Sequence, residues 1–291
     1  MRILVLGGDG MLGHQLLRQW RDRHEVRVTL RLGLDAYQHL SLFNIENSFD
    51  CVDASNTERI GNILRSWQPA AVVNAIGVVK QRDDANKHIP SLEINALFPH
   101  RLAELCGAAE SRLVHVSTDC VFSGRKGSYT EDDPCDVQDI YGMTKFLGEL
   151  GNGEGITFRT SIIGLELTRK SSLIEWFLSQ GGSIRGFRKA IYSRLTTMEM
   201  SRVIERVLAS YSELTGLWHI ASRPIDKYTL LKMLAEKLGR TDVTIEPYDD
   251  FVCDRSLDGS RFDNITGYSP PEWGVMLDEL ATEIQERERR R

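Results

Sequence analysis

The stretch MRILVLGGDGMLGHQLLRQW, residues 1–20, decides the fold of this chain. A short apolar run leads directly into Gly7, Gly10 and Gly13, which lie three residues apart, and apolar residues with helical spacing follow them. The run predicts a buried strand, and the spacing predicts an amphipathic helix. Glycine, the residue type with the most backbone freedom, therefore occupies the junction between a strand and a helix.

The three glycines have separate roles at such a junction. Gly7 permits a tight backbone path, Gly10 lets a diphosphate approach the main chain, and Gly13 lets the helix pack close to the sheet. The amide groups at the helix start, at Met11 and Leu12, hold negative charge together with the positive end of the helix dipole. Because a strand precedes the glycines and a helix follows them, the context predicts a dinucleotide-binding turn rather than a plain glycine loop.

The end of the second expected strand bears on the choice of dinucleotide. Proteins that prefer NAD usually place an acidic residue there to bind the ribose 2′-hydroxyl. The segment EVRVTLR, residues 25–31, ends instead in Arg31, and no acidic residue stands beside it. Since an arginine can pair with a 2′-phosphate, the sequence favours NADP(H), with NAD(H) as the alternative.

Strand-like and helix-like segments alternate through the first half of the chain. Alternation of this kind indicates a parallel sheet that is wound on both faces. The expected fold class is α/β, with a doubly wound parallel sheet of the Rossmann type and a smaller, discontinuous substrate-binding lobe. Strands are expected at residues 2–7, 25–31, 49–54, 69–77, 111–122, 155–163 and 216–222.

The alternation breaks after residue 164. Helices are expected at 171–180, 196–210 and 228–239, with an irregular stretch between the first two and a loop-rich remainder after 239. We expect a dinucleotide-binding domain at residues 1–164 plus about 193–224, and a substrate-binding lobe at about 165–192 plus 225–291.

The composition limits the classes of function. The formal net charge of −5 gives no bulk electrostatic support for binding nucleic acid. No apolar run approaches the ~20 residues that a membrane span needs. The five cysteines are scattered without a CxxC pair, so neither a zinc site nor a disulfide framework is indicated. We expect no metal, no membrane partner and a reduced, cytoplasmic setting.

A candidate catalytic set follows the fifth expected strand. Tyr141 and Lys145 lie four residues apart on an expected helix and therefore share one face. Ser117 and Thr118 lie at the carboxyl end of the fifth strand, the sheet edge at which doubly wound folds bind ligands. Thr118 would hydrogen-bond a substrate oxygen, Tyr141 would transfer the proton, and Lys145 would place positive charge near the phenol and bind the nicotinamide ribose.

The tyrosine needs this charge for a physical reason. The pKa of a free tyrosine is about 10, and lowering it to 7 requires ~4 kcal/mol of preferential stabilisation of the phenolate. A lysine ammonium and an oxidised nicotinamide ring can supply that stabilisation in a site with little water. A hydroxyl, a tyrosine and a lysine in this order therefore predict a joint transfer of a hydride and a proton.

The motifs GGDGMLG, VVNAIG, EINALFPHRLAELC, STDCVFSGRKGSYTEDDP, YGMTKFLGE and FRTSIIG run along most of the chain. In these motifs the sequence resembles the extended short-chain dehydrogenase/reductase superfamily, and within it the dTDP-4-dehydrorhamnose reductase family. The resemblance implies reduction of the 4-keto group of a nucleotide-linked 4-keto-6-deoxysugar by NADPH or NADH, in the synthesis of polysaccharide precursors. It also implies that Thr118, Tyr141 and Lys145 are catalytic.

The resemblance extends to further cofactor-binding residues. Val52 and Asp53 would flank the adenine, and Asn95 would support the hydrogen bonds of the active site. The remaining implied cofactor contacts are Asn74, Ala75, Gly77, Ser117, Thr160 and Ser161.

Three positions depart from the family pattern. Cys120 stands where a tyrosine is usual, and Ile162 stands where rhamnose-forming members often have a tryptophan. Gln15 replaces a glutamate that some members link to a magnesium-bridged dimer, so no metal is carried over.

Substrate binding is expected to involve cations, because a sugar nucleotide carries a diphosphate. Arg188 and Arg194 lie in the basic segment SIRGFRKAIYSRLTT, residues 183–197, and either could clamp phosphates. The alternative for this segment is an exposed basic loop. Lys80, just after the fourth strand, and Cys120, as a wall of the site, are further expected substrate contacts. Arg255 and Arg261, in the segment CDRSLDGSRF at residues 253–262, are candidates of the same standing as Lys80.

Two other functions remain open. An epimerase-reductase of sugar nucleotides uses a cysteine two residues after its catalytic hydroxyl, which is the position of Cys120. A regulatory subunit of a methionine adenosyltransferase shares the fold and binds NADP and a partner enzyme. A dehydratase is disfavoured, because Cys120 stands where its catalytic glutamate is needed. A homodimer is also left open.

Overall fold

The structure is a computed structural model of the chain, and it describes residues 1–78 and 87–289. The chain forms two compact units, each discontinuous in sequence. The borders of the units run through two strands of the main sheet, so the expected domain boundaries stay a prediction. Unit 1 comprises Met1–Thr118, Gln138–Phe158 and Ser201–Leu217, and unit 2 comprises Asp119–Val137, Arg159–Met200 and Trp218–Arg291.

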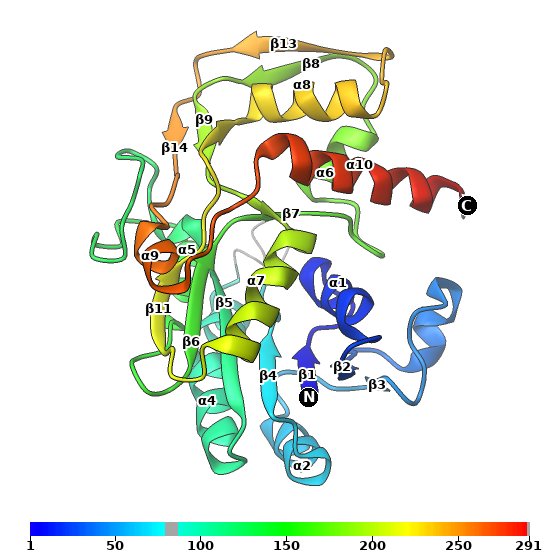
Figure 1. Cartoon of the computed structure of the whole chain (residues 1–291), viewed down its shortest axis with the longest axis vertical. Coiled ribbons are helices and arrows are strands. Elements are labelled where there is room, and N and C mark those ends of the chain that lie inside the picture. Colours follow the sequence, from blue (N-terminus) through cyan, green and yellow to red (C-terminus); the bar gives the residue numbers. More distant parts are fainter. Residues whose placement is uncertain (79–86, 290–291) are drawn as a thin grey trace. The chain divides into compact units, whose positions relative to one another are not determined.

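A seven-stranded sheet has the strand order β11-β6-β5-β4-β1-β2-β3 (Figure 1). The pairings of β1 with β2, β1 with β4, β2 with β3 and β4 with β5 are all parallel. The chain order changes direction between β1 and β4, as in a doubly wound sheet. The expected fold class is confirmed. The strands are β1 (Arg2–Leu6), β2 (Glu25–Thr29), β3 (Ser48–Phe49), β4 (Ala71–Asn74), β5 (Arg112–Thr118), β6 (Ile156–Thr160) and β11 (Gly216–His219).

The third strand is shorter than the sequence predicts. It was expected to continue through residue 54, but β3 ends at Phe49. Cys51 adopts a left-handed backbone conformation with φ of 51°, which an extended strand does not contain. The chain therefore turns at Cys51, although the amide of Val52 still donates to the carbonyl oxygen of Leu30 at 2.9 Å.

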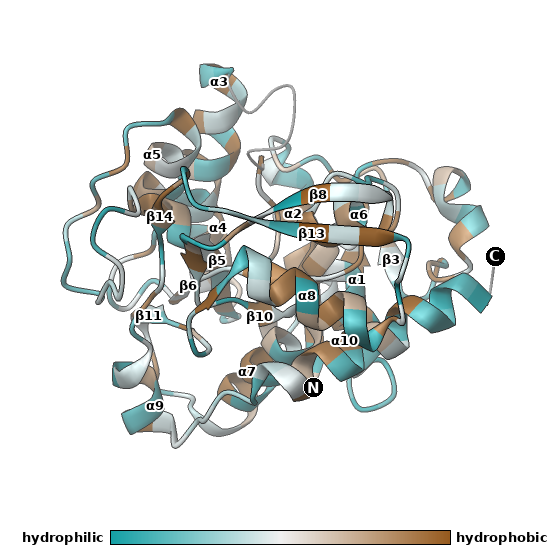
Figure 2. Cartoon of the chain, turned by 90° about the horizontal axis from the view of Figure 1, so that it is seen from above, coloured by the Kyte–Doolittle hydropathy of each residue, from teal (hydrophilic) through white to brown (hydrophobic). Residues whose placement is uncertain are grey.

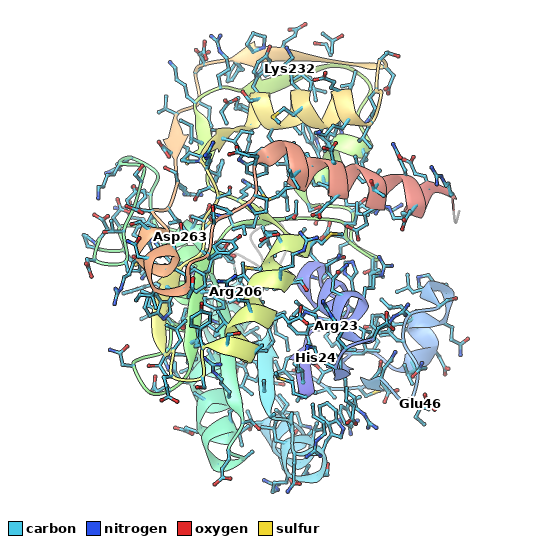
Figure 3. The ribbon with its side chains drawn as sticks, viewed as in Figure 1. Arg23, His24, Glu46, Arg206, Lys232 and Asp263 are labelled. Atoms are coloured by element: carbon cyan, nitrogen blue, oxygen red, sulfur yellow. The ribbon has the colours of Figure 1, made fainter. Side chains whose placement is uncertain are left out.

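Helices of unit 1 pack against the sheet. Helices α2 and α4 share one apolar core with β1, to which Leu4, Ile60, Leu64 and Leu102 contribute. The segment after α1 is linked to α7: Arg23 forms an ion pair with Glu205, and the Nε2 of His24 lies within hydrogen-bond distance of the same carboxylate, each at 2.9 Å. Figure 3 labels Arg23 and His24. The helical elements are α1 (Met11–Trp20), η1 (Leu34–Leu40), α2 (Thr57–Trp67), α3 (His88–Ser91), the π-helix η2 (Leu92–Leu97), α4 (Phe98–Ala108), α5 (Ile140–Leu147) and α7 (Thr197–Ser210).

Unit 2 has its own apolar core. Strands β8 and β13 pair in parallel and lie over α8, which packs against α10 (Figure 2). A small sheet in the order β12-β9-β14 continues from these elements. The elements are η3 (Asp119–Val121), β7 (Ile162–Ile163), α6 (Leu173–Leu178), β8 (Gly182–Phe187), β9 (Ala190–Tyr192), β10 (Leu195–Thr196), β12 (Ile225–Asp226), α8 (Lys227–Lys237), β13 (Val243–Tyr248), β14 (Cys253–Asp254), α9 (Ser260–Thr266) and α10 (Trp273–Arg289).

The prediction of a loop-rich remainder after residue 239 is wrong. Helix α10 covers 17 residues and supplies Met276, Leu277, Leu280 and Ile284 to the core of unit 2, each at most 2% exposed. These positions recur at intervals of three and four, which is the helical pattern. The stretch before residue 196, expected to be irregular, contains β8 and β9.

Among residues 1–78 and 87–289, no helix combines the length and the apolar character that a membrane-crossing segment requires.

Asp263 on α9 leads to a prediction about pH and stability (Figure 3). Burial, together with the charge of Asp258, raises the pKa of Asp263 to about 6. Because this lies above the unfolded value of about 3.9, the folded state gains stability as the pH falls through 6. We expect Asp263→Asn to raise the free energy of unfolding by about 1 kcal/mol at pH 8, since the side chain is partly exposed, and to change it little at pH 4.

Urea unfolding at the two pH values measures this effect. The control is Asp22→Asn, at a side chain that is 86% exposed. Its effect on the free energy of unfolding should be the same at pH 4 and at pH 8. An Asp263→Asn effect of equal size at both pH values would contradict the prediction.

Candidate active site

The glycine turn between β1 and α1 is held by contacts between backbone atoms. Gly7 has a φ of 84°, and its carbonyl oxygen accepts a hydrogen bond from the amide of Gly10 at 3.0 Å. A Cβ on Gly13 would lie 2.0 Å from that same oxygen, and a Cβ on Gly8 would lie 2.5 Å from the side chain of Val28. Side chains at positions 8 and 13 are therefore excluded by the fold itself.

The start of α1 fits a diphosphate. Gly10 is the N-cap residue and no side chain caps the helix, while the first turn contains no acidic residue. His14 bonds back to the carbonyl oxygen of Gly10 at 2.8 Å through Nδ1, so it does not cap the amides either. The first-turn amides, which include those of Met11 and Leu12, lie at the positive end of the helix dipole and can bind an anion.

The corner at the end of β2 brings both signs of charge together. Arg31 is exposed, and its charge contributes to lowering the pKa of Asp53, after the hydrogen bonds from Ser55. The Tyr37 hydroxyl donates to the Asp9 carboxylate at 3.0 Å. The sequence points to Arg31 and the family resemblance to Asp53. Neither points to Asp9 or Tyr37, because Asp9 belongs to the glycine turn and reaches this corner only in the folded chain.

Asn95 holds the segment after β4 against α5. Its Oδ1 accepts from the amide of Val78 at 2.9 Å, and its Nδ2 donates to the carbonyl oxygen of Val78 at 3.0 Å. The same Nδ2 lies 3.3 Å from the hydroxyl of Thr144 on α5. A Cβ on Gly148 would lie 1.9 Å from the carbonyl oxygen of Asn95, so η2 and the end of α5 are in close backbone contact.

Helix α5 carries the tyrosine and the lysine of the expected catalytic set. The Asp139 side chain caps the helix by accepting from the amide of Gly142 at 2.9 Å. Lys145 is 4% exposed, and its Nζ donates to the carbonyl oxygen of Val116 at 2.8 Å. Because Val116 lies two residues before Thr118 on β5, this bond positions α5 beside the carboxyl end of that strand. Burial lowers the pKa of Lys145 to about 8, against the opposing charge of Glu149.

Several of the implied cofactor residues bond within the protein. The Ser117 hydroxyl donates to Glu149 at 2.8 Å, and the carbonyl oxygen of Ser161 accepts from the amide of Leu195 at 2.9 Å. Thr160 is 2% exposed, and its hydroxyl lies 3.5 Å from the carbonyl oxygen of Ser161. These hydroxyls help to fix the backbone around them, and their role toward a cofactor stays a prediction. The same holds for Val52, which is buried, and for Ala75 and Gly77.

Three basic side chains of unit 2 converge around Tyr192, and we call them the cation cluster: Arg194, Lys227 and Arg255. The guanidinium carbon of Arg194 lies 4.1 Å from the centre of the Tyr192 ring, and the Lys227 Nζ lies 5.4 Å from it. Arg255 lies on the neighbouring strand segment, where its amide donates to the carbonyl oxygen of Ile191 at 2.9 Å. Its charge acts on Tyr192, and its Nε donates to the carbonyl oxygen of Phe122 at 2.8 Å. The small sheet β12-β9-β14 brings these side chains together.

The cation cluster lacks full charge compensation. Burial, followed by the positive charge of Arg194, lowers the pKa of Lys227, and Asp119 is the carboxylate that opposes this effect. The Nε of Arg194 is buried and has no hydrogen-bond partner among the described residues. Partly buried cations that repel one another favour a multivalent anion as ligand. The sequence pointed to Arg194 but not to Lys227, which carries no local signal.

Three other expected substrate contacts have different surroundings or lie outside the described residues; they are Arg188, Cys120 and Lys80. Arg188 forms a half-exposed ion pair with Asp249, so a phosphate would have to displace that carboxylate. The Sγ of Cys120 lies 3.5 Å from a guanidinium nitrogen of Arg255. Lys80 lies outside the described residues. Their expected contacts with a substrate stay predictions.

Comparisons with known proteins show the family and the fold of the chain. The sequence profile of the family described as "RmlD substrate binding domain" matches residues 1–163. The dTDP-4-dehydrorhamnose reductase of Burkholderia thailandensis is 30% identical over 166 residues, which are 55% of this chain and 50% of that protein. The chain spans about half the length of the first curated relatives that it matches.

Two solved structures show the same fold over nearly the whole chain. A hypothetical dTDP-4-dehydrorhamnose reductase from Sulfolobus tokodaii is 25% identical with a TM-score of 0.75, and the match covers 94% of this chain and 98% of that one. A dTDP-4-dehydrorhamnose reductase from Bacillus anthracis in complex with NADP has a TM-score of 0.78 at 19% identity, with 97% and 99% of the two chains covered.

The close contact at Gly13 predicts the effect of a single methyl group. We expect Gly13→Ala to weaken NADPH binding at least tenfold, because the new Cβ must push α1 away from the turn at which the diphosphate is expected to bind. Fluorescence titration with NADPH measures the affinity, and thermal unfolding checks the fold. Gly107→Ala is the matched control on α4, where a Cβ meets nothing within 4 Å; it should bind normally. Normal binding by Gly13→Ala would contradict the assignment of this turn.

Proposed function

The chain belongs to the family described as RmlD substrate binding domain, and we propose that it reduces the 4-keto group of a nucleotide-linked 4-keto-6-deoxysugar with NADPH. One observation carries the proposal. Unit 1 combines an uncapped glycine turn with a buried lysine, Lys145, which is bonded to β5 two residues before Thr118 and lies one helical turn after Tyr141. A carbonyl reductase needs a turn that binds the dinucleotide, a proton donor such as a phenol, and a cation such as an ammonium group that stabilises the phenolate.

The expected cofactor is NADP(H), with NAD(H) as the alternative. When bound, a reduced nicotinamide supplies the hydride. The first-turn amides of α1 would hold its diphosphate, and exposed Arg31 would pair with the 2′-phosphate. The related structure from Bacillus anthracis in complex with NADP supports this choice of dinucleotide.

The chain's own residues would handle the proton. Tyr141 would donate its phenolic proton to the carbonyl oxygen of the sugar, and Thr118 would hydrogen-bond the same oxygen. Lys145 in its ammonium form would stabilise the phenolate that Tyr141 becomes. Lowering the tyrosine pKa by about three units is worth ~4 kcal/mol, and a buried cation one helical turn away can supply much of that.

The cation cluster would bind the diphosphate of the sugar nucleotide. Arg194 and Arg255 can each form paired hydrogen bonds with phosphate oxygens, and Lys227 adds a point charge. A dianion would also relieve the mutual repulsion of the three cations. This assignment supports a phosphate-bearing substrate and leaves the base and the sugar open.

The environment of Cys120 supports one alternative. A guanidinium group 3.5 Å from its Sγ favours the thiolate, which is a stronger base than the thiol. An epimerase-reductase that removes a proton next to the ketone would use such a thiolate, and its product would take up solvent deuterium. A regulatory subunit would not need Thr118, Tyr141 and Lys145 together, so catalysis is favoured. A homodimer and a cytoplasmic location stay predictions.

Tyr141→Phe tests the proposed proton donor. We expect turnover to fall at least about 100-fold, since proton transfer is lost, while the affinity for NADPH stays near that of the wild type. Loss of NADPH absorbance with a panel of 4-keto-6-deoxysugar nucleotides measures turnover. Unchanged turnover would remove Tyr141 from the mechanism. A wild-type chain that reduces none of the panel but binds a partner protein tightly would favour the regulatory alternative.

Two lysines on α8 give a matched test of the cation cluster. Lys227→Met should raise the KM for the sugar nucleotide about tenfold or more, because a hydrogen bond between the ammonium group and phosphate is lost. The affinity for NADPH should stay unchanged. Lys232→Met is the control, at an exposed position of the same helix (Figure 3). Equal KM values for the two variants would contradict the assignment of the diphosphate to this cluster.

A further inference from the structure

A buried chain of polar side chains leads from β4 through β5 to α5. Asn74 is 1% exposed, His115 is fully buried, and Lys145 is 4% exposed. The Asn74 Nδ2 lies 3.1 Å from the His115 Nδ1, and the His115 Nε2 lies 3.4 Å from the Lys145 Nζ. All three residues belong to unit 1. Neither the expected catalytic roles nor the family resemblance makes use of His115.

The orientation of the Asn74 amide is fixed by the main chain. Its Oδ1 accepts from the amide of Ile76 at 3.1 Å. A backbone N–H can only donate, so the atom that faces it must be the oxygen. The NH₂ group of Asn74 therefore faces His115 and acts there as a donor.

This orientation selects one tautomer of His115. The Nδ1 atom must accept from the Asn74 NH₂ group, so it carries no proton. A neutral imidazole has one N–H, which is then on Nε2. Complete burial and the positive charge of Lys145 both oppose a second proton, and they lower the pKa of His115 well below its usual value.

The Nε2–H of His115 therefore faces the Nζ of Lys145. An ammonium group has only donors, so its contact with this N–H is unfavourable, whereas the lone pair of a neutral amine accepts from it. The amine can still donate to the carbonyl oxygen of Val116, the bond seen at 2.8 Å. Glu149 opposes this effect on Lys145 by its negative charge, and His100 acts on His115. Tyr141 lies one turn earlier on α5.

We propose that Asn74 and His115 are positioning residues that control the charge of Lys145: Asn74 fixes the Nε2–H tautomer of His115, and that N–H disfavours the ammonium form of the lysine. The pKa of about 8 for Lys145 agrees with this arrangement, although burial is its largest cause. The consequence for turnover rests on the proposed reductase function. With Lys145 active as the ammonium, kcat would decline as the pH rises through about 8.

The tautomer is tested first on the wild-type chain, without substrate. Two-dimensional NMR of protein labelled with [15N]histidine distinguishes the two neutral tautomers and the imidazolium, and His115→Phe identifies the signals. We expect His115 to stay in the neutral Nε2–H form from pH 5 to pH 9. An Nδ1–H tautomer, or protonation within this range, would overturn the proposal.

The link to Lys145 is tested with Asn74→Asp. An aspartate carboxylate accepts from the Nδ1–H of His115 and leaves Nε2 free to accept from an ammonium group. We expect the titration midpoint of Lys145, followed by NMR of [13C]lysine-labelled protein and identified with Lys145→Met, to rise by at least about one pH unit. His24→Gln, at the amino end of β2, is the control and should leave the midpoint unchanged.

Each outcome of the variant experiment is decisive. Retention of the Nε2–H tautomer in Asn74→Asp would overturn the role of Asn74, and a changed tautomer without a rise in the midpoint would overturn the link to Lys145. If the variant does not fold, the wild-type chain still tests both parts: the tautomer of His115 tests the role of Asn74, and a wild-type midpoint of Lys145 at the ordinary lysine value of about 10.4 instead of about 8 would overturn the link to Lys145. The alkaline limb of kcat should move upward together with the midpoint. Because both NMR measurements need no substrate, failure of the proposed reductase function leaves them valid.

Discussion

The close approach of Gly13 to the carbonyl oxygen of Gly7 is the constraint on which the dinucleotide turn depends. A single Cβ at position 13 would lie 2.0 Å from that oxygen, so no other residue type fits without moving the helix. The turn is tied to β2 as well, since Thr29 accepts from the amide of Gly8 at 2.8 Å and, through its hydroxyl, from that of Gly7 at 3.1 Å. With these amides occupied, the first-turn amides of α1 remain for a ligand.

A second contact of this kind positions α5. Gly148 approaches the carbonyl oxygen of Asn95 so closely that a Cβ would lie 1.9 Å from it, and the Asn95 side chain holds the segment after β4 at the same place. The helix is thereby pressed against β5, and Lys145 is buried among polar partners. Burying a lysine side chain destabilises the folded state unless its amino group is hydrogen-bonded. The same burial makes its charge sensitive to one neighbouring N–H, that of His115.

Unit 2 contains a destabilising feature of another kind, a cluster of positive charges. Arg194, Lys227 and Arg255 gather around Tyr192 with Asp119 as the opposing carboxylate, and a guanidinium nitrogen of Arg194 stays without a hydrogen-bond partner among the described residues. Like charges in one place destabilise a fold in the absence of a ligand. A bound dianion reverses this effect and adds stability in proportion to its affinity. Such local conflicts are expected where a protein binds its ligand.

The sequence by itself determined the glycine turn, the strand-helix alternation and the Tyr141–Lys145 pair, because each depends on residues close together in the chain and on the stereochemistry of glycine. The alternation was confirmed by the order of the seven strands. Helix α10 is not among the predicted elements, although its buried residues follow the helical spacing. Only the tertiary structure decided the cation cluster and the path from Asn74 through His115 to Lys145. Residues 194, 227 and 255 carry no pattern that links them, since what they share is a place in the fold. The tautomer of His115 on β5 is set by Asn74, which lies on the neighbouring strand β4.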